Sequence, residues 1–448
     1  MKTKKIQEKN PPFEPKEYQY KLENNWVRIL SVHCDVHINH FKDAVELIIM
    51  EPNLMSPAIL RAEITNDSNN LISNHNENTD RRIIRQLIPR QPEKDVVVTQ
   101  ELIVSSSDNQ MSVQHRAINH NNETVSPSEL PYFYPKFKSF RYSFIDQMLS
   151  IELLPYEDSQ ELIDDPRMIS IWKRILKFIY KFSFGMKNGY EKRVHHDIAV
   201  PKIEYQDLYA ELKTKYRHWV DLWPEETDPA KHVFEDIGIA TWLICLWKQE
   251  KTTKKYKFID LGCGNGFLTY LLTQEGYSGY GVDLSERKIW SQFPSSTKLY
   301  QRPIYPMEEK LEDVDWIIGN HPDELTLWIP IMASISKTKF MIIPCCLHEL
   351  SGQKFTKLDV NLGRYMTYCK AIEKLSTNLG FQIEWEHLRI PSTKNICLFS
   401  RNQTIVDGID SIIDDLTKTV NFNLRKTDRQ KTLEYLSKRE MKLNKQNV

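Results

Sequence analysis

The stretch "FIDLGCGNGFLTYLL", Phe258–Leu272, decides the fold of the second half of this chain. A short apolar run containing Asp260 leads into Gly262, Gly264 and Gly266 at alternate positions, and a second apolar run follows. Glycine accepts positive φ and lets the backbone approach a ligand without a Cβ in the way. The order of strand, glycine turn and helix therefore predicts a cofactor-binding turn.

The spacing of the glycines distinguishes between two classes of cofactor. A dinucleotide turn requires G-x-G-x-x-G, and from Gly262 the third glycine position holds Phe267, which weakens that interpretation. The sequence instead contains D-x-G-x-G-x-G, Asp260–Gly266, which resembles the first motif of S-adenosylmethionine-dependent methyltransferases. We expect the Asp260 carboxylate to lie near the positively charged methionine part of that cofactor. A glycine-rich turn without a ligand is the alternative.

The next predicted strand, "GYGVD", ends in a second acidic residue, Asp283. A carboxylate at this place can accept hydrogen bonds from both ribose hydroxyls of a nucleoside. Alternatively, Asp283 caps a helix predicted over "SERKIW". The predicted cofactor-binding residues are Asp260, Gly262, Cys263, Gly264, Asn265, Gly266, Asp283 and Asn320.

Short apolar runs alternate with helical stretches from Lys257 onward, a pattern typical of βαβ units and a parallel sheet. Five strands are predicted at "KFIDL", "GYGVD", "KLYQR", "VDWIIGN" and "KFMIIPCC", and Asp236–Trp247 is predicted as a largely buried helix before them. "FQIEWEHLRI" and "KNICLFS" add a final hairpin. This half of the chain is therefore α/β and resembles the Rossmann-like, seven-stranded domain of class I methyltransferases.

The first half mixes short apolar runs with polar tracts and is predicted to be an α+β region. Two Asn/Ser-rich tracts, Thr65–Asp80 and Ser105–Glu129, lack the apolar area needed to offset ordering entropy, so we expect mobile surface loops. Asp165–Lys187 carries apolar residues at helical spacing with basic residues between them, which favours an amphipathic core helix over an RNA-facing basic stripe.

Four divisions of the chain are predicted from these patterns. They are a polar tail over residues 1–25, an α+β region over 26–200 that we expect to aid RNA recognition, a methyltransferase domain over 201–402 and a basic helical tail over 403–448.

The composition excludes several classes of protein. Lys plus Arg equals Asp plus Glu at 60 each, so any nucleic-acid partner must be met by local basic patches. The seven cysteines form no C-x-x-C pair and no Cys/His ligand spacing, which predicts a reducing compartment and no metal site. The N-terminus has no apolar signal region, and no run approaches the roughly 20 apolar residues of a membrane span. We expect a soluble cytoplasmic protein, with the nucleus as the alternative.

Polar residues follow the predicted strand "VDWIIGN", at the edge of the sheet where α/β proteins bind ligands. Asn320 and Asp323 of "GNHPDEL" are the expected substrate-side groups. The stretch is similar to the N-P-P-aromatic motif of amino-methyltransferases, but His321 intervenes and the aromatic residue is missing, which disfavours N-methylation. Cys345 and Cys346 of "IPCC" are interpreted as buried thiols rather than as a nucleophile or metal ligands.

Several longer stretches are similar to one family. They are "YQDLYAELKTKYRHWV", "TDPAKHVFEDIGIA", "IIGNHPDELTLWIPIMAS", "LRIPSTKNICL" and, upstream, "ILRAEI" and "RRIIRQLIPRQPEKD". Together with the glycine turn they resemble the tRNA (uracil-2'-O-)-methyltransferases that modify uridine 44 of serine tRNAs. The resemblance implies a cytoplasmic enzyme that transfers a methyl group from S-adenosylmethionine to a ribose 2'-hydroxyl of tRNA. No obligate protein partner is evident.

Many 2'-O-methyltransferases use a Lys-Asp-Lys-Glu set, and this sequence does not single one out. The candidates are Asp323 or Asp315 for the aspartate, Lys339 or Lys394 for a lysine, and Glu384 or Glu386 for the glutamate. "LRIPSTKN" presents Arg389 and Lys394 beside a short turn as two cations without nearby acids, which suits phosphate contact or activation of the hydroxyl; a solvated turn is the alternative. We predict Asp323, Lys394 and Arg389 as catalytic residues.

Basic patches for RNA are predicted in two places. Arg81, Arg82, Arg85 and Arg90 cluster in "RRIIRQLIPR", and the segment from Arg425 to Lys445 carries eight basic residues against three acids. For that tail, an ordinary charged helix is equally compatible. Two other functions stay open, namely an N-methyltransferase acting on a base or a protein and a catalytically inactive RNA-binding scaffold.

Overall fold

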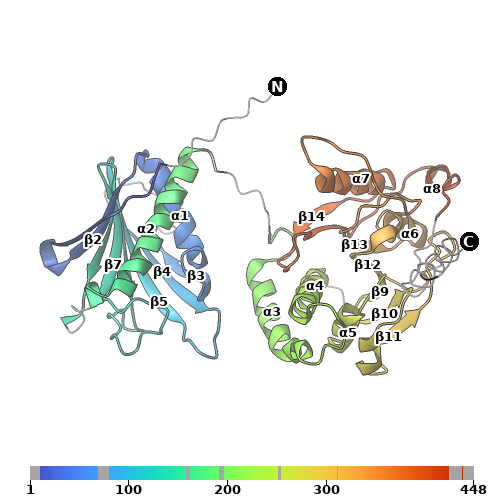
Figure 1. Cartoon of the computed structure of the whole chain (residues 1–448), viewed down its shortest axis with the longest axis horizontal. Coiled ribbons are helices and arrows are strands. Elements are labelled where there is room, and N and C mark those ends of the chain that lie inside the picture. Colours follow the sequence, from blue (N-terminus) through green and yellow to red (C-terminus); the bar gives the residue numbers. More distant parts are fainter. Residues whose placement is uncertain are drawn as a thin grey trace, which may run out of the picture. The chain divides into compact units, whose positions relative to one another are not determined.

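The structure is a computed structural model that describes residues 11–68, 80–157, 162–190, 196–250, 254–309, 311–422 and 436. The chain divides after Lys192 into two compact units, and each unit has its own β-sheet and its own buried core (Figure 1). Among these residues, no helix is long and apolar enough to cross a membrane.

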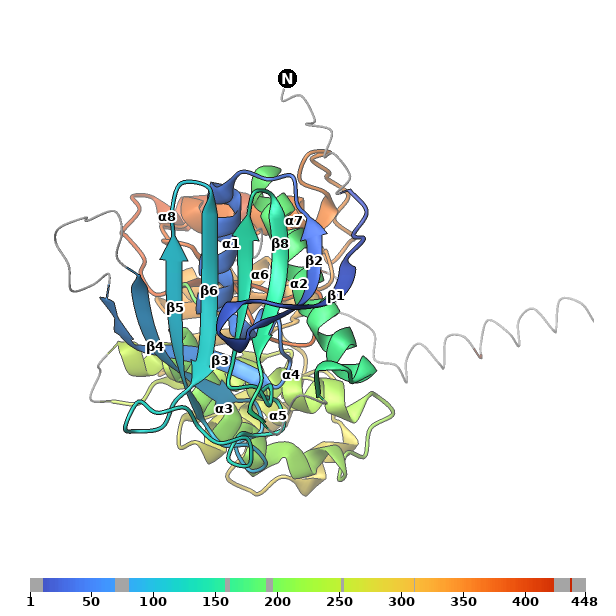
Figure 2. The same ribbon diagram turned by 90° about the vertical axis from the view of Figure 1, so that its left-hand side faces the viewer.

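The first unit is an eight-stranded antiparallel sheet in the order β1-β2-β8-β7-β6-β5-β4-β3. Two helices cover one face of the sheet and lie behind it in Figure 2. The α+β prediction for this region is therefore confirmed. The elements are β1 (Lys16–Lys21), β2 (Val27–His33), α1 (Ile38–Met50), β3 (Ile59–Asp67), β4 (Arg81–Pro89), β5 (Val98–Ser106), β6 (Gln110–Ala117), β7 (Ser139–Ile145), β8 (Met148–Leu154) and α2 (Pro166–Lys187).

Helix α2 forms where the sequence predicts an amphipathic core helix. The side chain of Asp165 accepts a hydrogen bond from the Arg167 amide, and Pro166 occupies the first turn, where its missing N–H costs nothing. Trp172, Leu176 and further apolar residues at spacings of three and four are buried against the sheet, and the basic side chains between them point away from that core.

Two expectations for the first unit are wrong. The tract Ser105–Glu129 is not a mobile loop, because it contains the end of β5 and the whole of β6. Although the tract is rich in polar residues, buried and more exposed residues alternate along β6, and Met111, Val113 and Ala117 lie on the buried side. Strand β1 likewise belongs to the sheet although it lies within the predicted tail over residues 1–25. For the tract Thr65–Asp80, residues 69–79 lie outside the described part of the chain.

The second unit is a seven-stranded sheet in the order β11-β10-β9-β12-β13-β15-β14, parallel except for β15. The predicted seven-stranded Rossmann-like sheet and its closing hairpin, β14–β15, are confirmed. The strands are β9 (Lys257–Leu261), β10 (Ser278–Asp283), β11 (Lys298–Gln301), β12 (Trp316–Asn320), β13 (Lys339–Ile343), β14 (Glu384–His387) and β15 (Ile396–Ser400). The helices are α3 (Lys202–Tyr216), α4 (Pro229–Gln249), α5 (Phe267–Gln274), α6 (Trp328–Ser336), α7 (Arg364–Asn378) and α8 (Ile409–Thr417).

Successive residues of each strand serve opposite layers of this unit. Phe258 and Trp316 pack with α3, α4 and α5, whereas Ile259 and Ile317 pack with α6, α7 and α8. This alternation explains the continuous apolar runs in the sequence, because a sheet covered on both faces has no polar side. The sheet is thus held rigidly, with the carboxyl ends of its parallel strands at one edge.

The boundaries of the second unit differ from the predicted 201–402. The backbone amides of Ile198 and Ala199 donate to the carboxylate of Glu386 on β14, so the unit includes residues before 201. At the other end, Ile413 of α8 is buried in the layer that contains α6 and α7. The basic stretch from Arg425 onward lies outside the described residues, apart from Leu436.

A stability prediction follows from the separate cores. Trp172 is 1 % exposed and its ring contacts Phe137 and Phe140, so Trp172→Ala should destabilise the first unit by about 3–5 kcal/mol. Calorimetry should show a lower unfolding temperature for one transition and no change in the other. Ile171→Ala, at an exposed position of the same helix, is the control and should shift neither transition measurably. A joint shift of both transitions with Trp172→Ala would contradict independent cores.

Candidate active site

The glycine turn between β9 and α5 requires three left-handed residues. Gly262, Gly264 and Gly266 have φ values of 72°, 53° and 72°, and the amides of Gly262 and Cys263 both donate to the carbonyl of Val282. A side chain at Gly266 would meet Leu299 at 2.7 Å, whereas a Cβ at Gly264 would meet no atom within 4 Å. The turn is therefore closed by β11 beneath Gly266 and open above Gly264.

Asp283 holds this turn against the end of β10. One carboxylate oxygen accepts from the Gly264 amide at 2.9 Å, and the other accepts from the Ser285 amide at 2.9 Å. The helix that follows is a short 3-10 segment, Lys288–Gln292, whose N-cap residue is Arg287. The alternative in which Asp283 caps that helix is therefore wrong. Each carboxylate oxygen retains a lone pair for a ligand hydroxyl.

Asp260, at the end of β9, is 1 % exposed. Its Oδ2 accepts from the Thr269 hydroxyl at 2.9 Å, and its buried Oδ1 has no hydrogen-bond partner in the described parts of the chain. Burial raises the pKa of this carboxyl to about 7, the Thr269 hydrogen bond opposes that rise, and the Asp283 charge adds to it. Within the described residues Asp260 forms no ion pair with a basic side chain.

Two acids on α4 complete the site, and the sequence analysis assigned neither of them a role. The side chain of Asn320, at the end of β12, donates to Asp236 Oδ1 at 3.0 Å, and the ring of His321 contacts Glu235 Oε1 at 3.0 Å. Burial raises the pKa of Asp236, and the Glu235 and Asp260 carboxylates raise it further. The available signal was the pair of adjacent acids within α4, a largely buried helix whose N-cap is Asp228.

The remaining predicted cofactor residues support the turn through their backbone or short side chain. Asn265 Oδ1 accepts from the Phe267 amide at 2.7 Å and so begins α5. Cys263 is buried, and burial raises the pKa of its thiol, which marks it as a packing residue. The indole of Trp290 donates to the Gly264 carbonyl at 3.0 Å. All eight predicted cofactor residues therefore come from three neighbouring strand ends, β9, β10 and β12.

The site fits a cationic ligand that carries hydroxyl groups. Asp260 Oδ1 and Asn320 Oδ1 are buried oxygens without partners among the residues that the structure covers, and Asp236 and Asp283 add further acceptors. Buried acceptors of this kind need donors, and a buried negative charge needs a positive one. S-adenosylmethionine supplies an ammonium group, a sulfonium centre and two ribose hydroxyls, so these residues match its chemistry.

The predicted substrate-side residues differ in their surroundings. Asp323, in the 3-10 turn Asp323–Leu325, accepts from the Cys345 thiol at 3.3 Å. Lys394 precedes β15 and its Nζ lies 3.9 Å from the centre of the Tyr365 ring. The Arg389 guanidinium pairs with Asp197, donating from Nε at 2.8 Å, so the expectation of two cations without nearby acids is wrong for Arg389.

The other candidates for a Lys-Asp-Lys-Glu set lie elsewhere. Asp315 accepts from the Lys257 amide, Lys339 pairs with Glu250, and Glu384 pairs with Arg401, all beside the amino ends of parallel strands. Glu386 is occupied by the amides of residues 198 and 199. Asp323 and Lys394 are thus the candidates that stand at the carboxyl edge.

The pair Cys345 and Cys346 is less buried than expected. Cys345 is partly buried and Cys346 is exposed, and their sulfurs and an Asp323 oxygen lie within 4.8 Å of one another. Burial raises the pKa of the Cys345 thiol, and the Asp323 charge raises it further. These three groups could ligate a metal ion, whereas the sequence predicts no metal.

The arginine run of β4 does not form the predicted phosphate-binding cluster. Arg85 is 2 % exposed because it shares the core face of the strand with Ile83 and Leu87. All four arginines have partners within the first unit. Arg81 forms ion pairs with Asp67 and Glu46, and Arg82 forms one with Glu101. Arg85 donates to Gln100 and to the Ile49 carbonyl, and Arg90 donates to the Pro57 carbonyl.

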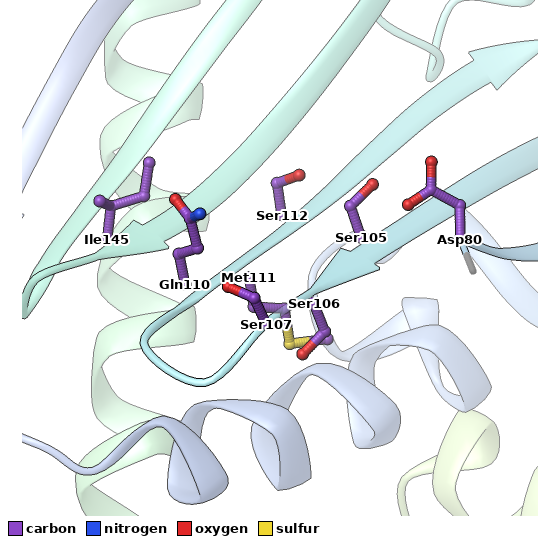
Figure 3. A pocket seen from close by; sticks show the side chains of 8 residues that line it. All are labelled: Asp80, Ser105, Ser106, Ser107, Gln110, Met111, Ser112 and Ile145. Carbon is purple, nitrogen blue, oxygen red and sulfur yellow. The ribbon is translucent and has the colours of Figure 1, made fainter. Parts of the chain in front are cut away.

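A hollow of about 360 Å³ lies beside the β5–β6 hairpin of the first unit (Figure 3). Among the described residues that line it, no side chain is cationic. It is lined by Asp80, Ser105, Ser106, Ser107, Gln110, Met111, Ser112 and Ile145.

Two family models match the chain, one for each unit. The model described as "TRM44-like, N-terminal bet v1-like domain" matches residues 4–193, and the model described as "Predicted AdoMet-dependent methyltransferase" matches residues 199–306. With the sheet order and the acceptor-rich turn, the second match defines the second unit as a class I methyltransferase domain whose cofactor is S-adenosylmethionine.

Similar proteins identify the family. A tRNA (uracil-O(2)-)-methyltransferase of Kluyveromyces lactis is 32% identical over 85% of this chain and 90% of its own length, and one of Yarrowia lipolytica is 33% identical over 84% and 90%. A human protein named "Probable tRNA (uracil-O(2)-)-methyltransferase" is 37% identical over 56% of this chain and 34% of its own length. The chain belongs to the tRNA (uracil-O(2)-)-methyltransferase family, as its motifs indicate.

Solved structures resemble the second unit only distantly. Magnesium protoporphyrin IX methyltransferase from Synechocystis with bound SAM is 14% identical, over 44% of this chain and 95% of its own, with a TM-score of 0.28.

The buried carboxyl predicts how cofactor affinity depends on pH. The folded-state pKa of Asp260 lies above its ordinary value, so the empty site is more stable when Asp260 is protonated. The stability of the empty protein should therefore fall as pH rises from about 4 to 7. A cationic cofactor favours the ionised form, so its affinity should rise with pH up to about 7. Below pH 7 the log Kd of the unmodified protein should therefore fall by about one unit for each pH unit, and Asp260→Asn should bring this slope close to zero in calorimetric titrations between pH 5 and 8.

The matched control is Asp313→Asn, which removes an exposed carboxylate paired with Lys257 in the same unit. This variant should keep the slope of the unmodified protein. An unchanged slope in Asp260→Asn would show that Asp260 does not face the cationic part of the cofactor.

Proposed function

We propose that this chain transfers the methyl group of S-adenosylmethionine to the ribose 2'-hydroxyl of uridine 44 in serine tRNA, in the cytoplasm. The observation that carries the proposal is the acceptor-rich turn of this chain, which belongs to that family. Buried oxygens of Asp260 and Asn320 there have no hydrogen-bond donor among the described residues. The relatives from Kluyveromyces lactis and Yarrowia lipolytica carry the name tRNA (uracil-O(2)-)-methyltransferase, which supports tRNA as the substrate. The choice of serine tRNA and of position 44 rests on the resemblance of the motifs.

The cofactor would be held by the turn and its neighbours. The Gly262–Gly266 backbone admits the ligand above Gly264, Asp283 accepts from ribose hydroxyls, and Asp260 with Asn320 accepts from the amino-acid end. When bound, S-adenosylmethionine supplies a methyl group on a positively charged sulfur. The acids of this chain stabilise that charge and orient the ligand, while the packed α4 and α5 layer keeps water from the buried oxygens.

The substrate side would lie at the adjacent edge of the sheet. We assign Asp323 and Lys394 to contacts with the target nucleotide, since both stand beyond the carboxyl ends of parallel strands. Arg389 is paired with Asp197, so its role is to position the "LRIPSTKN" turn and to present a partly neutralised cation to a phosphate.

Methyl transfer to a base or a protein is the second candidate. It is suggested by the "GNHP" stretch, in which Asn320 matches the first residue of the N-P-P-aromatic motif, although His321 and the missing aromatic residue depart from that motif. The two candidates differ in the nucleoside that the reaction produces.

Reaction with labelled cofactor and total tRNA tests the function directly. After nuclease digestion, the label should appear in 2'-O-methyluridine, and mapping should place it at position 44 of serine tRNA. Label in a methylated base would favour the second candidate. Absence of transfer to any tRNA, with retained RNA binding, would favour a scaffold.

Asp283→Ala should lower cofactor affinity by at least about tenfold, because two anchoring hydrogen bonds and the hydroxyl acceptor are lost together.

The outer face of α2 is the RNA surface that we assign to the first unit. The helix contains six basic residues and no acidic residue. Arg174 and Lys181 are exposed and two turns apart on one face, with exposed Lys177 between them. Most of the apolar side of α2 is buried in the core and its basic side chains face outward, which suits a polyanion.

Charge reversal on this face should weaken tRNA binding. For the double variant Arg174→Glu with Lys181→Glu, we expect a Kd for tRNA at least about tenfold higher at physiological salt. The slope of log K against log salt should fall by about two, because two phosphate contacts are removed. Lys94→Glu with Lys138→Glu, at exposed loop positions of the same unit, is the matched control. Equal effects from the two double variants would show that only net charge matters.

A further inference from the structure

Two neighbouring strands of the second sheet end beside a pair of thiols and a carboxylate. Strands β12 and β13 run parallel, with Asn320 opposite Ile343 at their last pair. Asp323 follows β12 at the carboxyl edge, and Cys345 and Cys346 follow β13 after a single proline. The order of the strands therefore brings residues that are 22 positions apart in the sequence to one place.

The backbone of the turn after β12 fixes where Asp323 lies. His321 and Asp323 have φ values of 55° and 44°, in the left-handed region that few residue types enter readily. The His321 amide donates to the Ile343 carbonyl at 3.2 Å. The Thr326 hydroxyl donates to the Asp323 carbonyl at 2.7 Å. These hydrogen bonds hold the turn beside the end of β13, where the Asp323 carboxylate accepts from the Cys345 thiol at 3.3 Å.

The three side chains have a spacing close to that of a metal site. Their donor atoms, the two Sγ atoms of Cys345 and Cys346 and an Asp323 oxygen, lie within 4.8 Å of one another. Around one tetrahedral zinc ion, ligands at about 2.0–2.3 Å from the metal lie roughly 3–4 Å from one another, so the set has to contract by only about 1 Å. Cys346 is exposed and Asp323 is partly buried, so both side chains have room to adjust. Within the described residues, no other group of three His, Cys, Asp or Glu side chains has this spacing.

The types of ligand select the metal. Thiolates are soft ligands that favour zinc and copper(I), whereas magnesium and calcium prefer oxygen ligands. A carboxylate is a hard ligand, which disfavours copper(I). Zinc accepts both sulfur and carboxylate oxygen in tetrahedral sites and takes no part in redox chemistry. The mixed set of two thiols and one carboxylate therefore fits zinc.

The charges around the thiols favour a cation over the other roles that paired cysteines have. Burial raises the pKa of the Cys345 thiol, and the Asp323 charge and the Cys346 thiol raise it further. A thiol held in its protonated form is a poor nucleophile and resists oxidation. A divalent cation reverses this effect, because it stabilises thiolate ligands and offsets the carboxylate charge.

We propose that Cys345, Cys346 and Asp323 bind one zinc ion, which joins the turns after β12 and β13. Both thiols release their protons to solvent as the two zinc–sulfur bonds form, and one Asp323 oxygen is the third ligand. Three protein ligands leave a fourth coordination position for water. The second Asp323 oxygen stays available for a contact with the target nucleotide. This proposal does not rest on the proposed function, because zinc binding requires neither cofactor nor tRNA.

Titration of the whole chain, prepared metal-free under reducing conditions, with zinc alone is the primary test. We expect one equivalent of bound zinc per chain in competition with a chromophoric chelator. Cobalt(II) in place of zinc should give thiolate-to-cobalt charge-transfer absorption together with the intense visible bands of a tetrahedral ion. In calorimetry, zinc should raise the unfolding temperature of the second unit and leave that of the first unit unchanged, since a ligand stabilises only the fold that binds it.

Cys346→Ser is the decisive variant, because Cys346 is exposed and the fold should tolerate the change. Zinc affinity should fall by at least about 100-fold, since the loss of an outer-shell partner alone costs about 10–100-fold. Asp323→Asn should lower the affinity by at least about tenfold and keep the charge-transfer absorption of the thiolates. The matched controls are Cys245→Ser, at a buried thiol of α4, and Asp313→Asn, at an exposed acid of the same unit. Both controls should bind zinc as the unmodified protein does.

The proposal is overturned if the unmodified protein binds no zinc, or if Cys345→Ser and Cys346→Ser bind it as tightly as the unmodified protein. A cobalt spectrum without thiolate charge transfer would also overturn it, because the metal would then have other ligands. Alkylation separates the metal site from a disulfide. In the metal-free protein Cys346 should react with iodoacetamide, and zinc should protect it. If Cys346 in protein isolated without reductant reacts only after a reductant is added, the pair forms a disulfide and the metal site is wrong.

Discussion

The cofactor turn at the carboxyl edge of the second sheet depends on the hydrogen bond from the Gly264 amide to the Asp283 carboxylate. It joins the ends of two neighbouring parallel strands and holds the turn that contains the three left-handed glycines at alternate positions. Without it, the turn would have to hold its conformation against the greater backbone entropy of glycine. The Ser285 amide on the second oxygen fixes the carboxylate from the opposite side, so its rotation is restricted.

The site brings together several acids that would be unfavourable without a ligand. Asp236 and Asp260 are both buried, and burial together with neighbouring carboxylates raises the pKa of each. Glu235 and Asp283 lie beside them, and the described contacts supply amide and hydroxyl donors rather than a cation. A positively charged ligand offsets this repulsion, and that relief contributes favourably to the free energy of binding. Selectivity for a sulfonium compound over its neutral product follows from the same charges.

Much of the second unit could be predicted because local patterns determine it. Strand β9 has the predicted bounds, α4 contains the predicted helix Asp236–Trp247, and the closing hairpin follows its turn residues. The acids of α4 were missed because the contact of Asp236 with Asn320 joins residues 84 positions apart, and spacing carries no information on such a pair. Sequence alone also misplaced Arg85, although a strict period of two from Ile83 to Leu87 puts it on the core face. Strand β6 was missed because its composition is polar. Only every second residue of a strand faces the core, so apolar residues at alternate positions are enough to anchor it.

Trp290 gives the cofactor turn an optical label of its own. Its indole N–H is bonded to the Gly264 carbonyl, and its ring lies within contact of the position that a Cβ at Gly266 would take. Indole emission is sensitive to the polarity around the ring and to the partner of the N–H. A movement of the turn that lengthens this hydrogen bond would therefore change the fluorescence emission of Trp290, a residue that takes no part in the chemistry. The protein with and without bound cofactor should differ in the emission wavelength of this residue without an added probe.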